Sequence, residues 1–159
     1  MGQLQAVESL VTTLKTSPVV LDYGRNIATA IVSGPHNHCA ATLSALLVFV
    51  GIYPNGGGTG NRDLEPWVPS LASDLENRRG WSRITYTPQA GPSLPLQPGD
   101  VGVVMASATT HHIFLIIDPA DQKVPLIADN QSTGMHPRAL AGDPAANFSP
   151  TSYILRAPA

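Results

Sequence analysis

The segment HNHCAATLSALL, residues 36–47, carries the only cysteine of the chain at the start of a nearly uninterrupted apolar run. Residues 38–50 are apolar on almost every side, which is typical of a helix buried within a core. Asn37 is a suitable N-cap residue, and Gly51 follows where helices commonly end. The sequence therefore predicts a central buried helix with Cys39 in its first turn.

Helical and strand patterns occupy different parts of the chain. Apolar residues recur at helical spacing in residues 3–15, a second helical stretch covers residues 22–32, and residues 64–79 carry a weaker helical pattern. Short β-rich runs follow, and Pro, Gly and Asp separate them. These runs are WSRITY (81–86), DVGVVMAS (100–107), HHIFLIID (111–118), VPLIADNQ (124–131) and SYILRA (152–157). Helices followed by strands predict an α+β domain, with the central helix packed on a mostly antiparallel sheet.

Composition limits the classes of function. The chain has 159 residues, is 43% hydrophobic and carries a net charge of −2, which predicts a single domain over residues 1–159 and gives no electrostatic footprint for nucleic acid. One cysteine excludes an internal disulfide framework, and no apolar run is long enough to span a membrane. The N-terminal residues lack the features of a signal peptide. We expect synthesis in the cytoplasm, with export by a dedicated secretion system or release by lysis, and no cofactor.

The position of Cys39 suggests a nucleophile. A thiol in the first turn of a helix lies near unpaired N–H groups and the positive end of the helix dipole, and both lower the pKa of a cysteine. A nearby imidazole would add to this effect and carry protons. The alternative is an inert cysteine that fills the core, since free cysteine is among the most buried residue types.

The run HHIFLIID supplies the imidazole. His112 shares a strand face with Phe114, and His111 lies on the other face. A catalytic imidazole needs a partner that fixes its orientation, and the next strand ends in Asp129, Asn130 and Gln131. A hairpin that pairs residue 118 with residue 123 would place His112 opposite Asp129, with Gln131 next on the same face. A hairpin with an odd loop would offer Asn130 instead.

The order of these features resembles the papain-like cysteine peptidases and amidases of the NlpC and CHAP groups. The resemblance covers about residues 20–135. The stretch WVPSLASDLENRRGW also looks like the helix and GW turn before the PGD motif of CHAP domains. The matching features are Cys39, Gly51-Ile52, Pro98-Gly99-Asp100, His112-Ile113-Phe114-Leu115-Ile116, and Asp129 with Gln131. The chain departs from the NlpC pattern at His38, Ala40 and Ala41 around the thiol, and at Phe114, where the family has a small residue.

The resemblance implies a cysteine peptidase or amidase. His112 takes the proton of Cys39, the thiolate attacks an amide carbonyl, and Asp129 orients the imidazole. The Cys39 backbone N–H, and the Tyr23 hydroxyl as a secondary candidate, would stabilise the oxyanion. Families of this shape mostly cleave peptidoglycan stem peptides, which implies a bacterial cell-wall hydrolase. An antibacterial effector of this kind would need an immunity protein as a partner.

Three alternatives remain open. His36, His38, Cys39 and His112 are residue types that bind zinc. The same thiol and imidazole could instead perform acyl transfer or side-chain deamidation, depending on which acceptor meets the thioester. A binding module could also retain the scaffold without catalysis.

Overall fold

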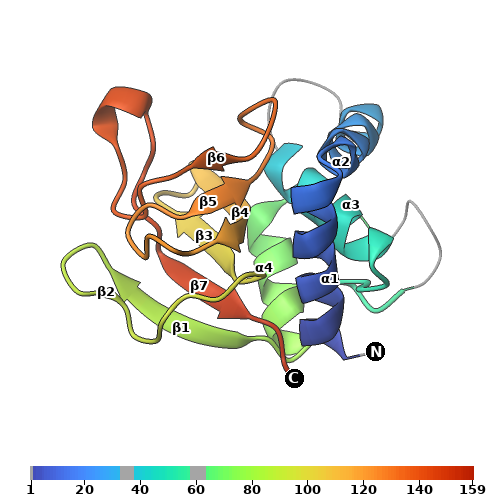
Figure 1. Cartoon of the computed structure of the whole chain (residues 1–159), viewed down its shortest axis with the longest axis horizontal. Helices are drawn as coiled ribbons and strands as arrows, with labels where there is room; N and C mark the ends of the chain where they lie inside the picture. The colour runs from blue at the N-terminus through green and yellow to red at the C-terminus, as the bar shows by residue number, and fades with distance from the viewer. Residues whose placement is uncertain (1, 33–37, 58–63) are drawn as a thin grey trace.

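The computed structural model describes residues 2–32, 38–57 and 64–159. Its four described α-helices lie on one side of a curled antiparallel sheet, as Figure 1 shows, and a short 3₁₀ helix, η2 (Pro144–Ala146), lies in the loop before β7. The helices are α1 (Gln3–Thr16), α2 (Val19–Ile31), α3 (His38–Phe49) and α4 (Val68–Asn77). The strands are β1 (Ser82–Thr87), β2 (Gly91–Pro92), β3 (Val101–Met105), β4 (His111–Asp118), β5 (Leu126–Ala128), β6 (His136–Pro137) and β7 (Tyr153–Arg156). They form one sheet in the order β2-β1-β7-β3-β4-β5-β6.

The predicted α+β architecture is confirmed, and all the neighbouring strands that the structure describes pair antiparallel. The observed α2 begins at Val19, three residues before the predicted stretch. Strand β5 covers only 126–128, because the chain leaves the sheet after Ala128. The short strands β2 and β6 carry too few residues to show a period-2 pattern, and the sequence did not predict them.

Helix α3 is the buried centre of the domain. Its residues from Cys39 to Leu47 are all buried, as the all-round apolar pattern predicted. The proposed N-cap residue Asn37 lies outside the described residues. On the sheet, the odd-numbered residues Ile113, Leu115 and Ile117 of β4 share a core cluster with Cys39 and the helices. None of the described helices has the length and apolar character needed to cross a membrane.

The other face of the sheet has its own apolar cluster around Phe114 and Ile116. Phe114 is fully buried opposite Gly102 of β3, and its ring occupies the space where a side chain at residue 102 would lie. The same ring stacks on His112 at 6.0 Å between centroids and lies beneath the Arg138 guanidinium at 5.0 Å. Phe114 therefore supports the histidine that the sequence analysis singled out.

The PGD motif forms the turn that starts β3. Gly99 adopts φ +94°, and a side chain there would collide with Val7 of α1. Asp100 is 2% exposed, and its carboxylate accepts hydrogen bonds from the Arg156 Nε and terminal amino groups at 2.8 and 2.7 Å. This bidentate contact joins the start of β3 to β7. The motif therefore has a structural role in the described fold.

The predicted register of the β4–β5 hairpin is wrong by two residues. Leu115 lies opposite Ala128 and Ile116 opposite Ile127, with an irregularity before Asp118, which pairs with Leu126. The connection is longer than predicted because Asp118 and Asp121 fold it into turns, accepting hydrogen bonds from backbone amides within the loop. A shift of two keeps every side chain on its predicted face, since the strand period is two. Asp129 therefore still follows the strand on the His112 side of the sheet.

We predict that Gly102→Ala destabilises the protein, because the new methyl group would displace the Phe114 ring. The free energy of unfolding should fall by about 1–3 kcal/mol, which is typical of overpacking. Urea denaturation at neutral pH measures this change. Gly102→Ala combined with Phe114→Leu should recover part of the loss. Equal stability of Gly102→Ala and the wild type would contradict the prediction.

Candidate active site

The carboxylate of Asp129 is the centre of the site. Its side chain is fully buried directly after β5. Oδ2 accepts a hydrogen bond from His112 Nε2 at 2.8 Å, and Oδ1 accepts from His136 Nε2 at 2.9 Å. The Gln131 backbone N–H donates to Oδ1 at 2.9 Å. Asp129 thus joins the start of β4, the loop after β5 and strand β6.

These contacts keep Asp129 ionised. Burial alone would raise the pKa of this carboxyl group, and it is the largest single influence on it. The hydrogen bonds and charges of His112 and His136 together outweigh burial and lower the pKa of Asp129 to about 2. The site therefore holds a buried carboxylate at every pH at which a typical enzyme works.

His112 is a neutral imidazole in this environment. Burial lowers its pKa below the ordinary histidine value, and the nearby Asp129 only partly offsets this effect. An ionised carboxylate can only accept a hydrogen bond, so the proton of the neutral ring lies on Nε2 and points to Asp129. Nδ1 then carries the free lone pair. This is the tautomer that a general base requires, with the base nitrogen turned away from its orienting carboxylate.

Cys39 lies in the first turn of α3, as predicted, but its pKa is not lowered. The thiol is 7% exposed, and burial raises the pKa of Cys39 above the ordinary value. The backbone N–H groups of Ile113, Ala40 and Cys39 itself favour the thiolate and only partly compensate. The expectation of a low pKa at the helix start was wrong because desolvation outweighs the helix-end amides here.

The open edge of β4 connects Cys39 with His112. Ile116 exchanges backbone hydrogen bonds with Gly99 and Asp100 in the turn that precedes β3. Because successive residues of an antiparallel strand direct their backbone groups to opposite sides, the N–H and C=O groups of the odd-numbered residues of β4 point toward β5. Strand β5 ends at Ala128, and the Ile113 N–H lies beyond this end, where it stabilises the Cys39 sulfur. The thiol reaches the edge from the helix side, and His112 leaves the strand on the other face. The structure records no hydrogen bond between the two side chains.

The remaining predicted residues take different places. Tyr23 is 49% exposed and its ring contacts Phe49 at the last residue of α3. Phe49 lies ten positions after Cys39 in the helix, which is a distance of about 15 Å along the helix axis. The prediction of Tyr23 as an oxyanion donor is therefore wrong, because α2 pairs with α3 so that Tyr23 meets its far end. Asn130 and Gln131 do not bind His112: Gln131 Oε1 accepts from Arg138 at 3.3 Å, and the Asn130 side chain points toward α3.

Two residues of the site escaped the sequence analysis. His136 supplies the second imidazole on Asp129, and Arg138 is a 2% exposed guanidinium that lies 4.4 Å from the centre of the Phe148 ring. His136 is the first residue of the two-residue strand β6 and Arg138 directly follows this strand, which is too short to show a periodicity. The remaining signal was the concentration of polar residue types in MHPR after the predicted strand.

The zinc alternative finds no geometric support among the residues that the structure describes. Within them, no group of three His, Cys, Asp or Glu side chains is arranged to hold a metal ion. His36 lies outside the described residues. His38 Nε2 instead lies 3.2 Å from the Val32 carbonyl oxygen, within hydrogen-bond distance.

Comparison with family models, curated proteins and solved structures finds no match to this chain. The functional argument therefore rests on the geometry of Cys39, His112 and Asp129.

We predict that Asp129 stabilises the fold in a pH-dependent way. Its pKa is about 2 in the folded protein against 3.8 ordinarily, so the stabilisation is complete above pH 4 and is lost as the pH falls toward 2. This shift corresponds to about 2 kcal/mol. The gap in unfolding free energy between wild type and Asp129→Asn, measured in urea, should narrow by this amount between pH 6 and pH 2. A constant gap would contradict the assignment.

A second prediction concerns the reactivity of Cys39, the only thiol in the chain. Because burial raises its pKa, alkylation by iodoacetamide should be slow at pH 7, and its rate should still be rising without a plateau above the ordinary cysteine pKa of about 8.5. Mass spectrometry of the intact protein gives the rate at each pH. A fast plateau below pH 7 would instead indicate a preformed thiolate–imidazolium pair. That result would contradict the neutral state of both groups.

Proposed function

We propose that this protein is a cysteine-dependent amide hydrolase of the papain-like type, with Cys39 as nucleophile, His112 as general base and acid, and Asp129 as orienting residue. The observation that carries the proposal is the His112–Asp129 hydrogen bond of 2.8 Å, which leaves Nδ1 of a neutral imidazole unused one residue before Ile113, whose backbone N–H binds the Cys39 sulfur. A buried carboxylate–imidazole pair that supplies a base to a cysteine is typical of nucleophilic catalysis.

The protonation states favour activation of the thiol during the attack. The pKa of Cys39 is raised and that of His112 is lowered, so both groups are neutral before substrate binds. As the sulfur attacks the carbonyl carbon, its proton moves to Nδ1 of His112 and the carbonyl oxygen becomes an oxyanion. Asp129 stabilises the imidazolium that forms. Backbone N–H groups at the start of α3 are suited to the oxyanion.

The tetrahedral intermediate collapses in the second step. The carbon–nitrogen bond breaks, the amine leaves with the proton from His112 Nδ1, and a thioester to Cys39 remains. His112 then takes a proton from water, and the resulting hydroxide attacks the thioester carbon. The carboxylic acid product departs, and the thiolate recovers its proton from His112. Catalytic hydrogen bonds of free enzymes are often longer than those in the substrate complex, so the proposal requires the thiol–imidazole contact only when substrate is bound.

The proposed substrates are the stem peptides of peptidoglycan. The support is the order of features that resembles NlpC and CHAP domains: the thiol on a buried helix, the PGD turn before β3 and the histidine at the head of β4. Such an enzyme reaches the cell wall by a dedicated secretion route or by lysis. An antibacterial role would require an immunity protein in the producing cell.

Purified peptidoglycan incubated with the protein, followed by mass spectrometry of the released fragments, tests the proposal. We expect the wild-type protein to cleave amide bonds that stay intact in peptidoglycan without protein. Cys39→Ala and His112→Ala should abolish this cleavage. Asp129→Asn should lower the rate about 10²–10⁴-fold, because the imidazole loses its orienting acceptor. For Cys39→Ala, loss of cleavage with an unchanged unfolding midpoint separates catalysis from folding. The rate of the less stable Asp129→Asn is compared at a temperature at which circular dichroism shows that it is folded.

Lys123→Gln is the matched control, since this exposed loop residue lies away from the site. It should cleave at the wild-type rate. Full activity of Cys39→Ala would remove the thiol from the mechanism. Cleavage that a chelator abolishes and zinc restores would favour the metal alternative.

A further inference from the structure

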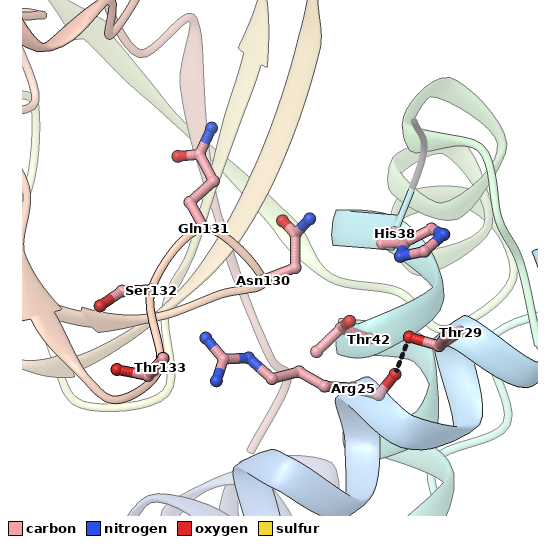
Figure 2. Close-up of a pocket in the computed structure, with 8 residues that line it drawn as sticks. All are labelled: Arg25, Thr29, His38, Thr42, Asn130, Gln131, Ser132 and Thr133. Carbon is pink, nitrogen blue, oxygen red and sulfur yellow. Dashed lines mark hydrogen bonds between the residues drawn. The ribbon is translucent and has the colours of Figure 1, made fainter. Parts of the chain in front are cut away.

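A polar cavity of about 350 Å³ lies beside the first turns of α3. Figure 2 shows its three walls: Arg25 and Thr29 of α2, His38 and Thr42 of α3, and the loop 130–133. The same elements carry the proposed catalytic residues, since Cys39 lies between His38 and Thr42 and the loop directly follows Asp129. The cavity is therefore lined by chain neighbours of Cys39 and Asp129, while neither of these two side chains lines it.

Three buried polar atoms in these walls have no hydrogen-bond partner within the described parts of the chain. They are Arg25 Nε, Thr42 Oγ1 and Asn130 Oδ1. Thr42 is 1% exposed, so its hydroxyl has little access to bulk water. A buried polar atom without a partner costs about 1–3 kcal/mol. The three residues come from three separate segments and all line this cavity, so side-chain rotation toward a bound ligand would give each of these atoms a partner.

The charge of the cavity defines the ligand. The Arg25 side chain extends from α2 toward Thr133 and is 17% exposed (Figure 2). Its nearest acidic group, Asp22, lies 3.7 Å from Nη1 and is 58% exposed, too distant for a hydrogen bond. No Asp or Glu is among the described residues that line the cavity. A guanidinium with unused donors in a partly buried site favours a planar anion that accepts two parallel hydrogen bonds.

The geometry points to a carboxylate-binding subsite in which Arg25 holds a free carboxylate of the peptide substrate close to the amide bond that is cleaved. This inference rests on the proposed hydrolase function and specifies its substrate class. The Thr42 hydroxyl donates a further hydrogen bond to the carboxylate. The Asn130 Oδ1 accepts from a neighbouring N–H of the same peptide, which a simple inorganic anion does not have. Acidic peptides are therefore favoured over peptides in which this carboxylate is an amide.

Stem peptides offer a matched pair for the test. The probes are L-Ala-γ-D-Glu-L-Lys with an amidated C-terminus and the same peptide with the D-Glu α-carboxylate replaced by a carboxamide. Calorimetric titration into the Cys39→Ala protein measures binding without turnover. We expect the carboxylate peptide to bind about 10- to 100-fold more tightly, the range for a charged hydrogen bond. Arg25→Gln in this background should abolish the preference, and Thr42→Val should reduce it.

Two further variants sharpen the result. Arg25→Lys keeps the charge without the planar fork and should retain only part of the preference. Lys123→Gln also removes one positive charge, but from a loop outside this cavity, and should leave the preference unchanged. A preference that survives Arg25→Gln, or no binding of either peptide, would overturn the subsite. If the carboxylate peptide is preferred through Arg25 but the wild type cleaves no peptidoglycan, the subsite stands and the hydrolase proposal is refuted. If the wild type cleaves peptidoglycan but does not prefer the carboxylate peptide, the hydrolase proposal stands and the subsite is refuted.

Discussion

The hydrogen bonding of one buried carboxylate determines how the sheet edge is built. An ionised carboxylate without partners is far too costly to bury, so Asp129 can occupy its position only while its donors are present. The donors come from β4, from the turn after β5 and from β6. The last two of these segments are short, with three residues in β5 and two in β6. The requirement to solvate Asp129 within the protein therefore holds them in one arrangement, and the same arrangement fixes His112.

The electrostatics of the site also decide between two kinds of thiol chemistry. A thiolate–imidazolium pair forms when the pKa of the thiol falls below that of the imidazole. In this protein burial acts in opposite directions on the two groups, raising the pKa of Cys39 and lowering that of His112. Both directions favour the neutral pair, so in the proposed mechanism Asp129 would become important at the moment when the imidazolium forms. This resembles general-base activation of a hydroxyl more closely than use of a preformed thiolate.

The sequence was informative where the pattern of apolar residues is strong. The all-round apolar run identified α3, and alternation along HHIFLIID placed His112 and Asp129 on one side of the sheet even though the register was wrong by two residues. It was uninformative where a contact depends on packing between elements. Tyr23 was misplaced because the sequence does not say which end of α3 meets α2. The raised pKa of Cys39 depends on burial by the sheet, and His136 depends on the pairing of a two-residue strand.

The turn after β5 connects the proposed catalytic residue Asp129 with the proposed carboxylate-binding cavity. The Asp129 carboxylate accepts from the backbone N–H two residues later, which closes a tight turn at Gln131. Within this turn both Asn130 and Gln131 line the cavity, and the Gln131 side chain points away from α3 (Figure 2). The Gln131 Oε1 accepts a hydrogen bond from Arg138. The contact that orients the imidazole therefore also positions one wall of the cavity. Any change that weakens the Asp129 turn should disturb both the orientation of His112 and the wall of the cavity. A change at Arg25 should alter the cavity alone. Arg25 belongs to α2, and among the described residues it makes no hydrogen bond to the turn.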